Sequence, residues 1–351
     1  MAQRIMVMAG GTGGHVFPAL AVAQYLQEQN WQVSWLGSKQ GLESRVIPEQ
    51  GIAIDYLSVN GLRGKGLFAK VVAPFMLLKA CAQAFKVLRE RKPQVVLGMG
   101  GFVAGPGGLM AKALGIPLII HEQNRIPGTT NRLLSKIATS VLEAFSGSFQ
   151  SKINAVATGN PLRQELTNIP AKDFWQGQRE FRILIVGGSQ GAQILNTEIP
   201  TVLAKLTGVT VRHQTGSAMY EQVLRQYQSL NISAEVSAFI ADMRSAYCWA
   251  DMVICRSGAM TVSEIAAAGL PAILIPFPYA IDDHQTANAK ILTDAGAALL
   301  LAQRDFNIEN VLFQIKYVQD NIAIMVKNAK QIARLDATQA VANICIAKAK
   351  L

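Results

Sequence analysis

The sequence has few cysteines, no long apolar run and no Asp-x-Asp metal motif. Its four cysteines show no paired spacing and no signal peptide is visible at its start, so we expect reduced, buried thiols in a cytoplasmic protein. The longest apolar runs, such as residues 71–78, are interrupted by Pro74 and fall far short of the roughly 20 residues that a membrane-spanning helix needs. Zinc-finger spacing and basic–aromatic ribonucleoprotein motifs are both absent, which argues against nucleic acid as a partner.

What the sequence does contain is enough apolar material for two domains and an excess of positive charge. Hydrophobic residues make up 50% of its 351 residues, and a domain takes roughly 150 residues. The formal net charge of +10 favours anionic partners. The anionic partners to consider are nucleic acid, nucleotide diphosphates and acidic lipid surfaces. Nucleic acid is the weakest of the three, so we expect one of the other two.

Three short apolar runs, each typical of a buried strand, lead directly into glycine-rich loops. The runs at residues 5–9, 94–97 and 183–186 precede loops at residues 10–15, 98–108 and 187–192. Such loops expose backbone N–H groups and let a ligand approach closely, so they could hold a diphosphate. The first loop reads GGTGG rather than G-x-G-x-x-G, and no acidic residue follows the strand at 32–36, which argues against an NAD enzyme.

The series of strand, glycine loop and helix at the start of the chain is repeated from residue 181 onward. This repetition predicts an α/β fold of two doubly wound, Rossmann-like domains with a ligand cleft between them. We place the first domain at residues 1–159 and the second at residues 160–335, joined near Gly159, Asn160 and Pro161. Residues 336–351 have apolar positions at helical spacing, and we expect this helix to pack back on the first domain.

The stretch around residues 255–289 is where we predict the donor site. Two buried-strand patterns, at 252–255 and 272–275, each lead into a polar or glycine-bearing turn and a helix. Ligands bind at the carboxyl ends of parallel strands, so these two turns should meet over one crevice. There, N–H groups at a helix start could face a diphosphate and Glu264 could accept from two ribose hydroxyls. The alternative is that residues 257–264 are only a capping box that opens an alanine-rich helix.

Two histidines lie where the crevice of the first domain is expected. His15 directly follows the first glycine loop, where a group of pKa about 6.5 could be the general base for an attacking hydroxyl. It could equally orient acceptor oxygens or cap the helix. His121 begins a polar run, HEQN, at the end of a strand, and it could instead be a buried histidine satisfied by its neighbours.

The segment between Arg63 and Lys92 combines an apolar stripe with lysine and arginine. A helix of this composition can lie on an anionic bilayer surface. An ordinary core-facing helix with a solvated basic edge would show the same pattern.

Eight motifs, in order over almost the whole chain, resemble the family of MurG-like glycosyltransferases: GGTGGHVFP, GLRGKG, GMGGFVAGPGG, HEQN, GNPLR, GGSQGA, RSGAMTVSEIAAAGLP and DDHQTANA. The resemblance implies a GT-B fold. It also implies transfer of N-acetylglucosamine, with inversion, from UDP-N-acetylglucosamine to undecaprenyl-diphospho-N-acetylmuramyl-pentapeptide in peptidoglycan synthesis. The protein would act peripherally at the cytoplasmic face of the bacterial plasma (inner) membrane, with cell-envelope and division proteins as possible partners.

Site residues follow from the resemblance motif by motif. It implies donor contacts from Thr12, Gly13, Gly14, Asn124, Arg163, Ser189, Ile240, Ala259, Met260, Thr261, Val262, Ser263, Glu264, Gln285 and Asn288. Acceptor contacts would come from Gly11, His15, Gly100, Gly101 and Phe102, where Phe102 stands in place of a frequent tyrosine. Since no Asp-x-Asp motif is present, we expect no metal and no cofactor. Arg163 and the backbone donors of the second-domain loops would then stabilise the departing phosphate.

Two other functions use the same parts. A UDP-N-acetylglucosamine 2-epimerase shares the donor site, but it has no lipid diphosphate acceptor to hold and so no need of the two glycine loops in the first domain. A nucleotide-sugar-binding scaffold at the membrane would bind UDP without turnover.

Overall fold

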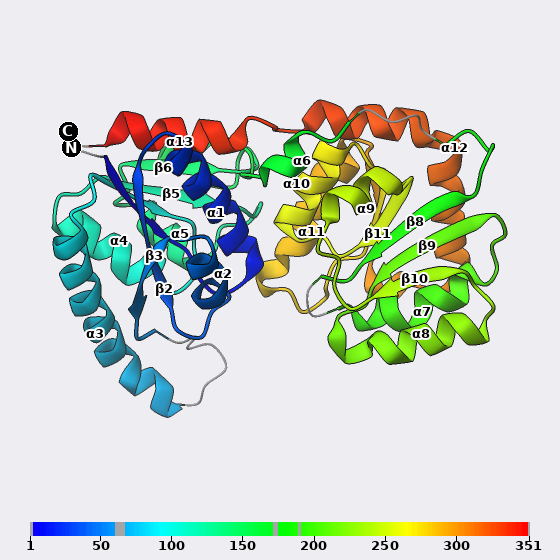
Figure 1. The fold of residues 1–351 in the computed structure, drawn as a ribbon, viewed down its shortest axis with the longest axis horizontal. Helices are drawn as coiled ribbons and strands as arrows, with labels where there is room; N and C mark the ends of the chain where they lie inside the picture. Colours follow the sequence, from blue (N-terminus) through cyan, green and yellow to red (C-terminus); the bar gives the residue numbers. More distant parts are fainter. Residues whose placement is uncertain (1–2, 60–66, 171–174, 189–190, 350–351) are drawn as a thin grey trace. The chain divides into compact units, whose positions relative to one another are not determined.

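The computed structural model describes residues 3–59, 67–170, 175–188 and 191–349, and the chain forms two compact units. Unit 1 comprises Met1–Arg163 with Arg334–Leu351, and unit 2 comprises Gln164–Ala333 (Figure 1). The segment 60–66, which includes the GLRGKG motif, and Ser189 lie outside the described residues.

Unit 1 is built on a parallel sheet of seven described strands. The strand order is β3 (Ala53–Leu57), β2 (Gln32–Ser38), β1 (Arg4–Met8), β4 (Val95–Gly98), β5 (Leu118–Glu122), β6 (Ser140–Glu143) and β7 (Val156–Ala157). Its helical elements are α1 (Gly13–Glu28), α2 (Glu43–Glu49), α3 (Leu67–Arg91), α4 (Ala104–Ala113), α5 (Thr129–Leu134), η1 (Ser151–Ile153) and α13 (Ala337–Lys348).

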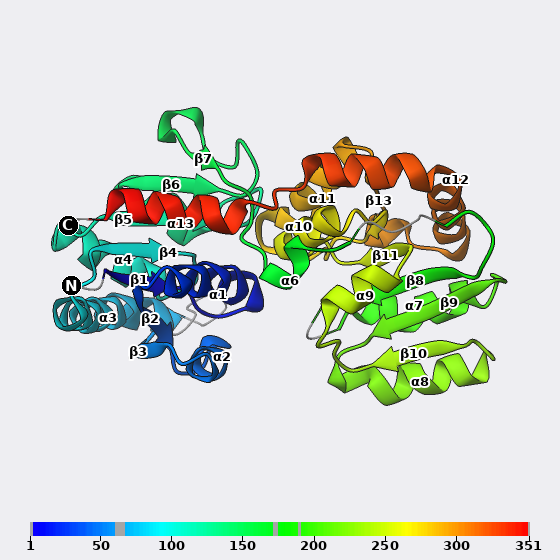
Figure 2. The ribbon, with the colours of Figure 1, turned by 45° about the horizontal axis from the view of Figure 1, so that its top comes forward.

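Strand β1 is apolar from Ile5 to Met8 because both faces of the sheet are covered there. Side chains alternate across a strand, so Ile5 and Val7 enter one core with α1, while Met6 and Met8 enter another with α3 and α4. The C-terminal helix α13 packs on α1 and β4 and places Val341, Ala342 and Cys345 in the first of these cores (Figure 2).

Unit 2 contains a second parallel sheet, of six described strands. Their order is β10 (Ala234–Ser237), β9 (Val209–Gln214), β8 (Phe181–Val186), β11 (Met252–Cys255), β12 (Ala272–Leu274) and β13 (Ala298–Leu300). The helical elements are α6 (Gln164–Thr167), α7 (Gln193–Leu203), η2 (Ser217–Met219), α8 (Tyr220–Ser229), α9 (Met243–Trp249), α10 (Ala259–Ala268), η3 (Ile281–Asp283), α11 (His284–Asp294), η4 (Gln303–Asp305) and α12 (Ile308–Ile332).

In each unit the chain order of the strands reverses at the centre of the sheet. The reversal lies between β1 and β4 in unit 1 and between β8 and β11 in unit 2. Loops that follow these strands diverge to opposite faces and leave a crevice in which α/β proteins bind ligands. The first glycine loop follows β1, the second follows β4 and the third follows β8, so all three lie at such positions.

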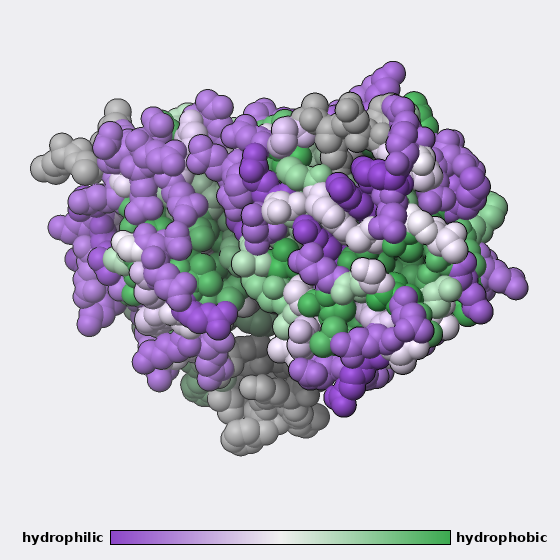
Figure 3. Space-filling model, turned by 45° about the vertical axis from the view of Figure 1, so that its right-hand side comes forward, coloured by the Kyte–Doolittle hydropathy of each residue, from purple (hydrophilic) through white to green (hydrophobic). Residues whose placement is uncertain are grey.

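Helix α1 begins at Gly13, five residues before the Pro18 start that its apolar pattern predicts. The glycines therefore belong to the first turn, whose N–H groups have no partner within the helix. Among the described residues, no helix is long and apolar enough to cross a membrane. The face shown in Figure 3 mixes hydrophilic and hydrophobic residues.

Candidate active site

The two glycine loops of unit 1 meet backbone to backbone. Gly101 has φ +81°, and a Cβ there would overlap the carbonyl oxygen of Gly10 and come within 3.1 Å of its carbonyl carbon. Gly100 lies against the ring of His15, 2.9 Å from Nδ1 when measured from an added Cβ. The structure therefore brings together Gly100, Gly101 and His15, with Phe102 beside them and 56% exposed.

A buried carboxylate, which the sequence did not indicate, holds the first glycine loop. Glu43 is fully buried and accepts hydrogen bonds from Gly11 N at 2.9 Å and from Ser38 N and Oγ at 2.8 and 2.7 Å. A Cβ at Gly10, Gly37 or Gly41 would overlap this side chain. Glu43 thus orients the backbone beside His15, and the pairing is not visible in sequence because Gly10 and Glu43 lie far apart along the chain.

His15 lies in the first turn of α1 and is half-buried. Its Nδ1 is 2.9 Å from Gln123 Oε1, and no side chain caps the start of α1. The helix-cap alternative for His15 is therefore wrong, because the ring turns toward β5 instead. Thr12 is the N-cap residue, and Gly13 and Gly14 follow it as the first two helical residues.

The HEQN run is held by a dense set of hydrogen bonds. Glu122 accepts from Asn124 N and Nδ2 at 2.9 and 3.1 Å, and from Gly128 N and Asn131 Nδ2 at 3.0 and 2.9 Å. His121 is fully buried, and burial lowers its pKa to about 4. It is the satisfied histidine that the sequence allowed for, bonded to Gly159 O and Gln123.

Arg163 ends unit 1 as the last residue of GNPLR. Its guanidinium carbon is 5.9 Å from the centroid of the Phe17 ring on α1. A cation over an aromatic face is attracted by the negative face of the ring. This contact places the positive charge beside the helix that carries Thr12 and His15.

Unit 2 contains an open cavity of about 900 Å³ at the carboxyl ends of β8 and β11. Ligand sites in proteins are of this size, roughly 300 to 1,000 Å³. Its lining comes from the glycine loop, the starts of α7 and α10, and the loop after β12: Val186, Gly187, Gly188, Gly191, Ala192, Gln193, Ile194, Thr197, Glu198, Ala218, Met219, Arg256, Gly258, Thr261, Phe277, Tyr279, Gln285 and Gln303. Thr261 and Gln285 are the expected donor residues that line it.

Helix α10 presents its N-terminus to this cavity. Gly258 is the N-cap residue and no side chain caps the helix, so the capping-box alternative is wrong. The first turn of a helix and the helix dipole together favour an anion. Glu264 lies one turn beyond Thr261, outside the cavity lining, and its Oε2 accepts from Tyr247 Oη at 2.9 Å.

Arg256 is a cavity residue that the sequence analysis did not single out. Its Nη1 donates to the carbonyls of Ile275 and Pro276, both at 3.0 Å, and its Nη2 donates to Gln303 Oε1 at 2.8 Å. The guanidinium carbon lies 5.4 Å from the Phe277 ring centroid, and partial burial lowers the pKa of Arg256. In the sequence, the feature that could have indicated Arg256 is its place directly after a buried strand. A site for an anion needs positive charge there.

Three expected donor residues have hydrogen-bond partners within unit 2. Asn288 is fully buried and donates from Nδ2 to Ser257 O at 3.3 Å. Ile240 N donates to Gln214 Oε1 at 3.2 Å, and Gln214 Nε2 donates to Gly188 O at 3.0 Å. Gln214 therefore ties the backbone of Ile240 to the glycine loop. Gln285 accepts from Phe277 N at 2.9 Å and so shapes the cavity wall.

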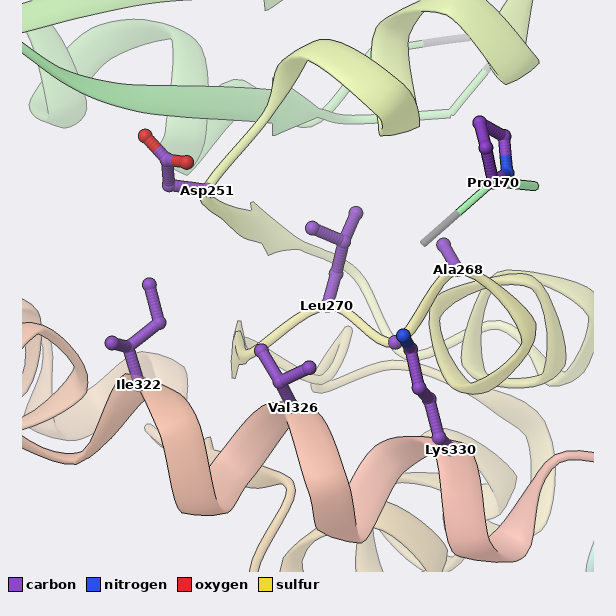
Figure 4. Close-up of a pocket in the computed structure, with 8 residues that line it drawn as sticks. Pro170, Asp251, Ala268, Leu270, Ile322, Val326 and Lys330 are labelled. Atoms are coloured by element: carbon purple, nitrogen blue, oxygen red, sulfur yellow. The ribbon is translucent and has the colours of Figure 1, made fainter. Parts of the chain in front are cut away.

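A second, small cavity lies at the other end of α10 (Figure 4). It is lined by Asp251, Ala268, Leu270, Val326 and Lys330, with Pro170, Gly269 and Ile322. Its volume of about 10 Å³ holds roughly one water. Asp251 is already paired with Arg179 at 2.6 Å, so this cavity is packing rather than a ligand site. The described residues contain no group of three or more His, Cys, Asp and Glu placed to hold a metal ion.

Both units match described protein families. Residues 5–143 match the glycosyltransferase family 28 N-terminal domain, and residues 182–347 match the glycosyltransferase family 28 C-terminal domain.

Similar proteins cover the whole chain. A Methylococcus capsulatus protein named UDP-N-acetylglucosamine--N-acetylmuramyl-(pentapeptide) pyrophosphoryl-undecaprenol N-acetylglucosamine transferase is 56% identical over 99% of both chains. A Shewanella frigidimarina protein of the same name is 49% identical over 99% of this chain and 97% of its own. The crystal structure of Acinetobacter baumannii MurG is 41% identical, with a TM-score of 0.84 over 98% of this chain and 99% of that one.

A Neisseria meningitidis UDP-GlcNAc 2-epimerase bound to UDP-GlcNAc is also similar in fold. Its TM-score is 0.67 over 98% of this chain and 100% of that one, at 15% identity. At that identity the likeness extends to the fold alone.

Proposed function

The chain belongs to glycosyltransferase family 28, and we propose that it transfers N-acetylglucosamine from UDP-N-acetylglucosamine to undecaprenyl-diphospho-N-acetylmuramyl-pentapeptide. Its two Rossmann-like units are those of a GT-B glycosyltransferase. The observation that carries the proposal is the unit 2 cavity, which joins a glycine loop, a helix N-terminus and Arg256. It occurs in a chain 56% identical over 99% of its length to a transferase named for this reaction.

The donor would be held by unit 2. Its diphosphate is matched by three features of the cavity: the backbone of the glycine loop, the N-terminus of α10 and the guanidinium of Arg256. Each is fixed before the ligand arrives, because Gln214 holds Gly188 and carbonyl groups hold Arg256. Preorganised donors of this kind stabilise the charge that develops as UDP departs. Glu264, one helical turn farther on, would accept from the ribose hydroxyls.

Unit 1 would hold the acceptor diphosphate and the general base. The paired glycine loops supply backbone donors, and His15 lies between them. In the reaction, the acceptor hydroxyl oxygen bonds to the anomeric carbon as the bond from that carbon to the UDP phosphate breaks. The hydroxyl proton passes to His15, and the bonding electrons leave with UDP. A single displacement of this kind inverts the anomeric configuration.

Peripheral attachment to the cytoplasmic face of the inner membrane is part of the proposal and is supported by α3. Phe75, Leu77, Leu78 and Phe85 are exposed on this helix, with exposed fractions from 38% to 71%. Lys79, Lys86 and Arg89 add positive charge beside them. This combination suits an anionic bilayer surface. Association with cell-envelope and division proteins rests on the family resemblance alone.

The test is transfer of radiolabelled N-acetylglucosamine from UDP to a lipid-linked acceptor. The proposal predicts label in the lipid fraction and one UDP released for each sugar transferred. A scaffold would bind UDP without moving the label. A 2-epimerase would convert the donor without any acceptor present. Either of these outcomes would replace the proposed function.

A further inference from the structure

A series of hydrogen bonds connects His15 to the backbone of Gly159 through two buried side chains. His15 Nδ1 lies 2.9 Å from Gln123 Oε1, and Gln123 Nε2 lies 3.1 Å from His121 Nδ1. His121 Nε2 lies 2.9 Å from the Gly159 carbonyl oxygen. Gln123 is 1% exposed and His121 is 0% exposed, so water does not compete for these partners.

The donor and the acceptor of each bond follow from the Gly159 carbonyl, at the end of the series. A backbone carbonyl only accepts, so His121 Nε2 must carry the ring proton. Burial lowers the pKa of His121 to about 4, which keeps the ring neutral near pH 7 and leaves Nδ1 as an acceptor. The NH₂ group of Gln123 therefore faces His121, where it also donates to the His121 carbonyl at 3.2 Å, and Gln123 Oε1 faces His15.

We propose that Gln123, oriented by His121, is a positioning residue that holds His15 in its Nδ1–H tautomer and so leaves the Nε2 lone pair to accept the acceptor's proton. Gln123 Oε1 only accepts, so His15 Nδ1 must donate to it. A neutral imidazole has one ring proton, and the bond at one nitrogen decides the state of the other. Among the described residues, none is hydrogen-bonded to His15 Nε2.

This arrangement matters because a free histidine side chain favours the opposite tautomer. With the proton on Nε2, the nitrogen that must act as the base is already occupied. Gly100 leaves room for the ring in this position, because a Cβ there would come 2.9 Å from His15 Nδ1 and Cε1. The inference rests on the proposed function only for the proton that Nε2 receives. The tautomer itself is a property of the protein without substrate.

The deciding experiment is long-range ¹H–¹⁵N NMR of the full chain labelled with ¹⁵N-histidine, at a pH of about 8, where an unperturbed imidazole is neutral. The chain has four histidines, and His15→Gln identifies the His15 signals by their loss. The wild type should show a protonated Nδ1 and an unprotonated Nε2. Gln123→Met should convert His15 largely to the Nε2–H form, and His121→Phe should do so in part, because the Gln123 amide is then free to turn over.

Gln94→Met is a matched control in the same unit. Gln94 Oε1 also accepts a partly buried hydrogen bond, from Arg4 N at 2.8 Å, but Gln94 takes no part in the series that connects His15 to Gly159. This variant should keep the wild-type His15 spectrum. An Nε2–H signal in the wild type would overturn the proposal, and so would an Nδ1–H signal retained in Gln123→Met.

Kinetics with a lipid acceptor connect the tautomer to turnover. His15→Ala should lose about 10²- to 10⁴-fold in kcat, which is the usual cost of a missing general base. Gln123→Met should fall between this variant and the wild type in kcat with little change in acceptor KM. If His15→Ala keeps a normal kcat, the positioning role is wrong even where the tautomer is as stated. If the wild type transfers no sugar, the proposed function fails, while the spectra still decide the tautomer.

Discussion

Glu264 is the residue on which recognition of the donor ribose depends in this account. It lies one turn beyond Thr261, and Tyr247 Oη donates to its Oε2 at 2.9 Å. A carboxylate that accepts from both ribose hydroxyls makes two charge-assisted bonds of roughly 1.5 to 3 kcal/mol each. Glu264→Ala should therefore lower kcat/KM for the donor by about 10²-fold or more.

A comparison of the natural donor with 2′-deoxy-UDP-N-acetylglucosamine makes this prediction specific. The wild type should discriminate strongly against the deoxy donor, and Glu264→Ala much less, because the missing hydroxyl then has no partner to lose. Tyr247→Phe is the matched control, since it removes the neighbouring hydroxyl and keeps the carboxylate. It should retain the discrimination. Unchanged discrimination in Glu264→Ala would return this residue to a structural role.

Two buried histidines predict how stability responds to acid. Burial lowers the pKa of His121 to about 4 and that of His213 to about 3. Below an unfolded-state pKa of about 6.5 the unfolded chain binds protons that the native chain does not, so stability falls as the pH drops toward these values. Each histidine contributes up to about 1.4 kcal/mol per pH unit in that window.

The measurement is urea unfolding between a pH of about 7.5 and a pH of about 5. The wild type should change little above a pH of about 6.5 and lose stability progressively below it. His213→Gln should show a shallower slope for unit 2 by about one proton. An identical slope in the variant would mean that His213 is protonated in the folded protein.

Which side chains meet at the site could be predicted only in part. The glycine loops, His15 and HEQN stand out because glycine and histidine have few other uses after a buried strand. Glu43 does not stand out, because its partners are backbone groups far away in the sequence. The contact between Gln123 and His15 was not predictable either, because the two residues are 108 positions apart. The position of Arg256 was not predictable, because its partners are the carbonyl groups of Ile275 and Pro276, on another part of the chain.

At the scale of elements, α3 predicts membrane association. Phe75 is 71% exposed, and Lys79 is exposed one turn along the helix. Phe75→Ser with Lys79→Glu should weaken binding to anionic vesicles, because it removes apolar area and reverses one charge. Turnover on a short-chain soluble acceptor should stay near normal, since these side chains lie outside the cores.

Helix α12 offers a matched control for this pair. Phe313 is 72% exposed and Lys327 is exposed, so Phe313→Ser with Lys327→Glu makes the same changes in apolar area and charge in unit 2. The control should bind vesicles as the wild type does. Equal losses of vesicle binding in both double variants would show that the attraction to the vesicle does not depend on α3. Equal loss of vesicle binding and turnover in the α3 variant would make α3 a structural helix.

The strands at the centre of each sheet were predictable, and so were β2 and β12 nearer the edges, whereas β9 and β10 in unit 2 were not. β1, β8 and β11 are nearly continuous apolar runs because both of their faces are covered. β9 reads VTVRHQ and β10 reads AEVS, with half-buried positions that lack a clear period. The capping-box interpretation near Glu264 was wrong because α10 begins at Ala259. Thr261 therefore lies inside the helix and is not its N-cap residue.

At the scale of the whole molecule, the repeated series of strand, glycine loop and helix gives two sheets with the same order of six strands, to which unit 1 adds β7. Both sheets reverse their strand order at the centre, and the glycine loops follow from that position. The two units differ in the charged and polar groups that they carry. In the proposed function, unit 2 would supply Arg256 and a helix N-terminus for an anionic leaving group, and unit 1 would supply His15, whose ring contacts Gln123.

The central claim is a single displacement at the anomeric carbon by an acceptor hydroxyl, with UDP as the leaving group. The most direct test is the NMR coupling constant at the anomeric proton of the sugar newly joined to the lipid-linked acceptor. Because the donor sugar is α-linked to UDP, the account predicts a β-linked product. An α-linked product would require a double displacement or a front-face mechanism, and it would contradict the account.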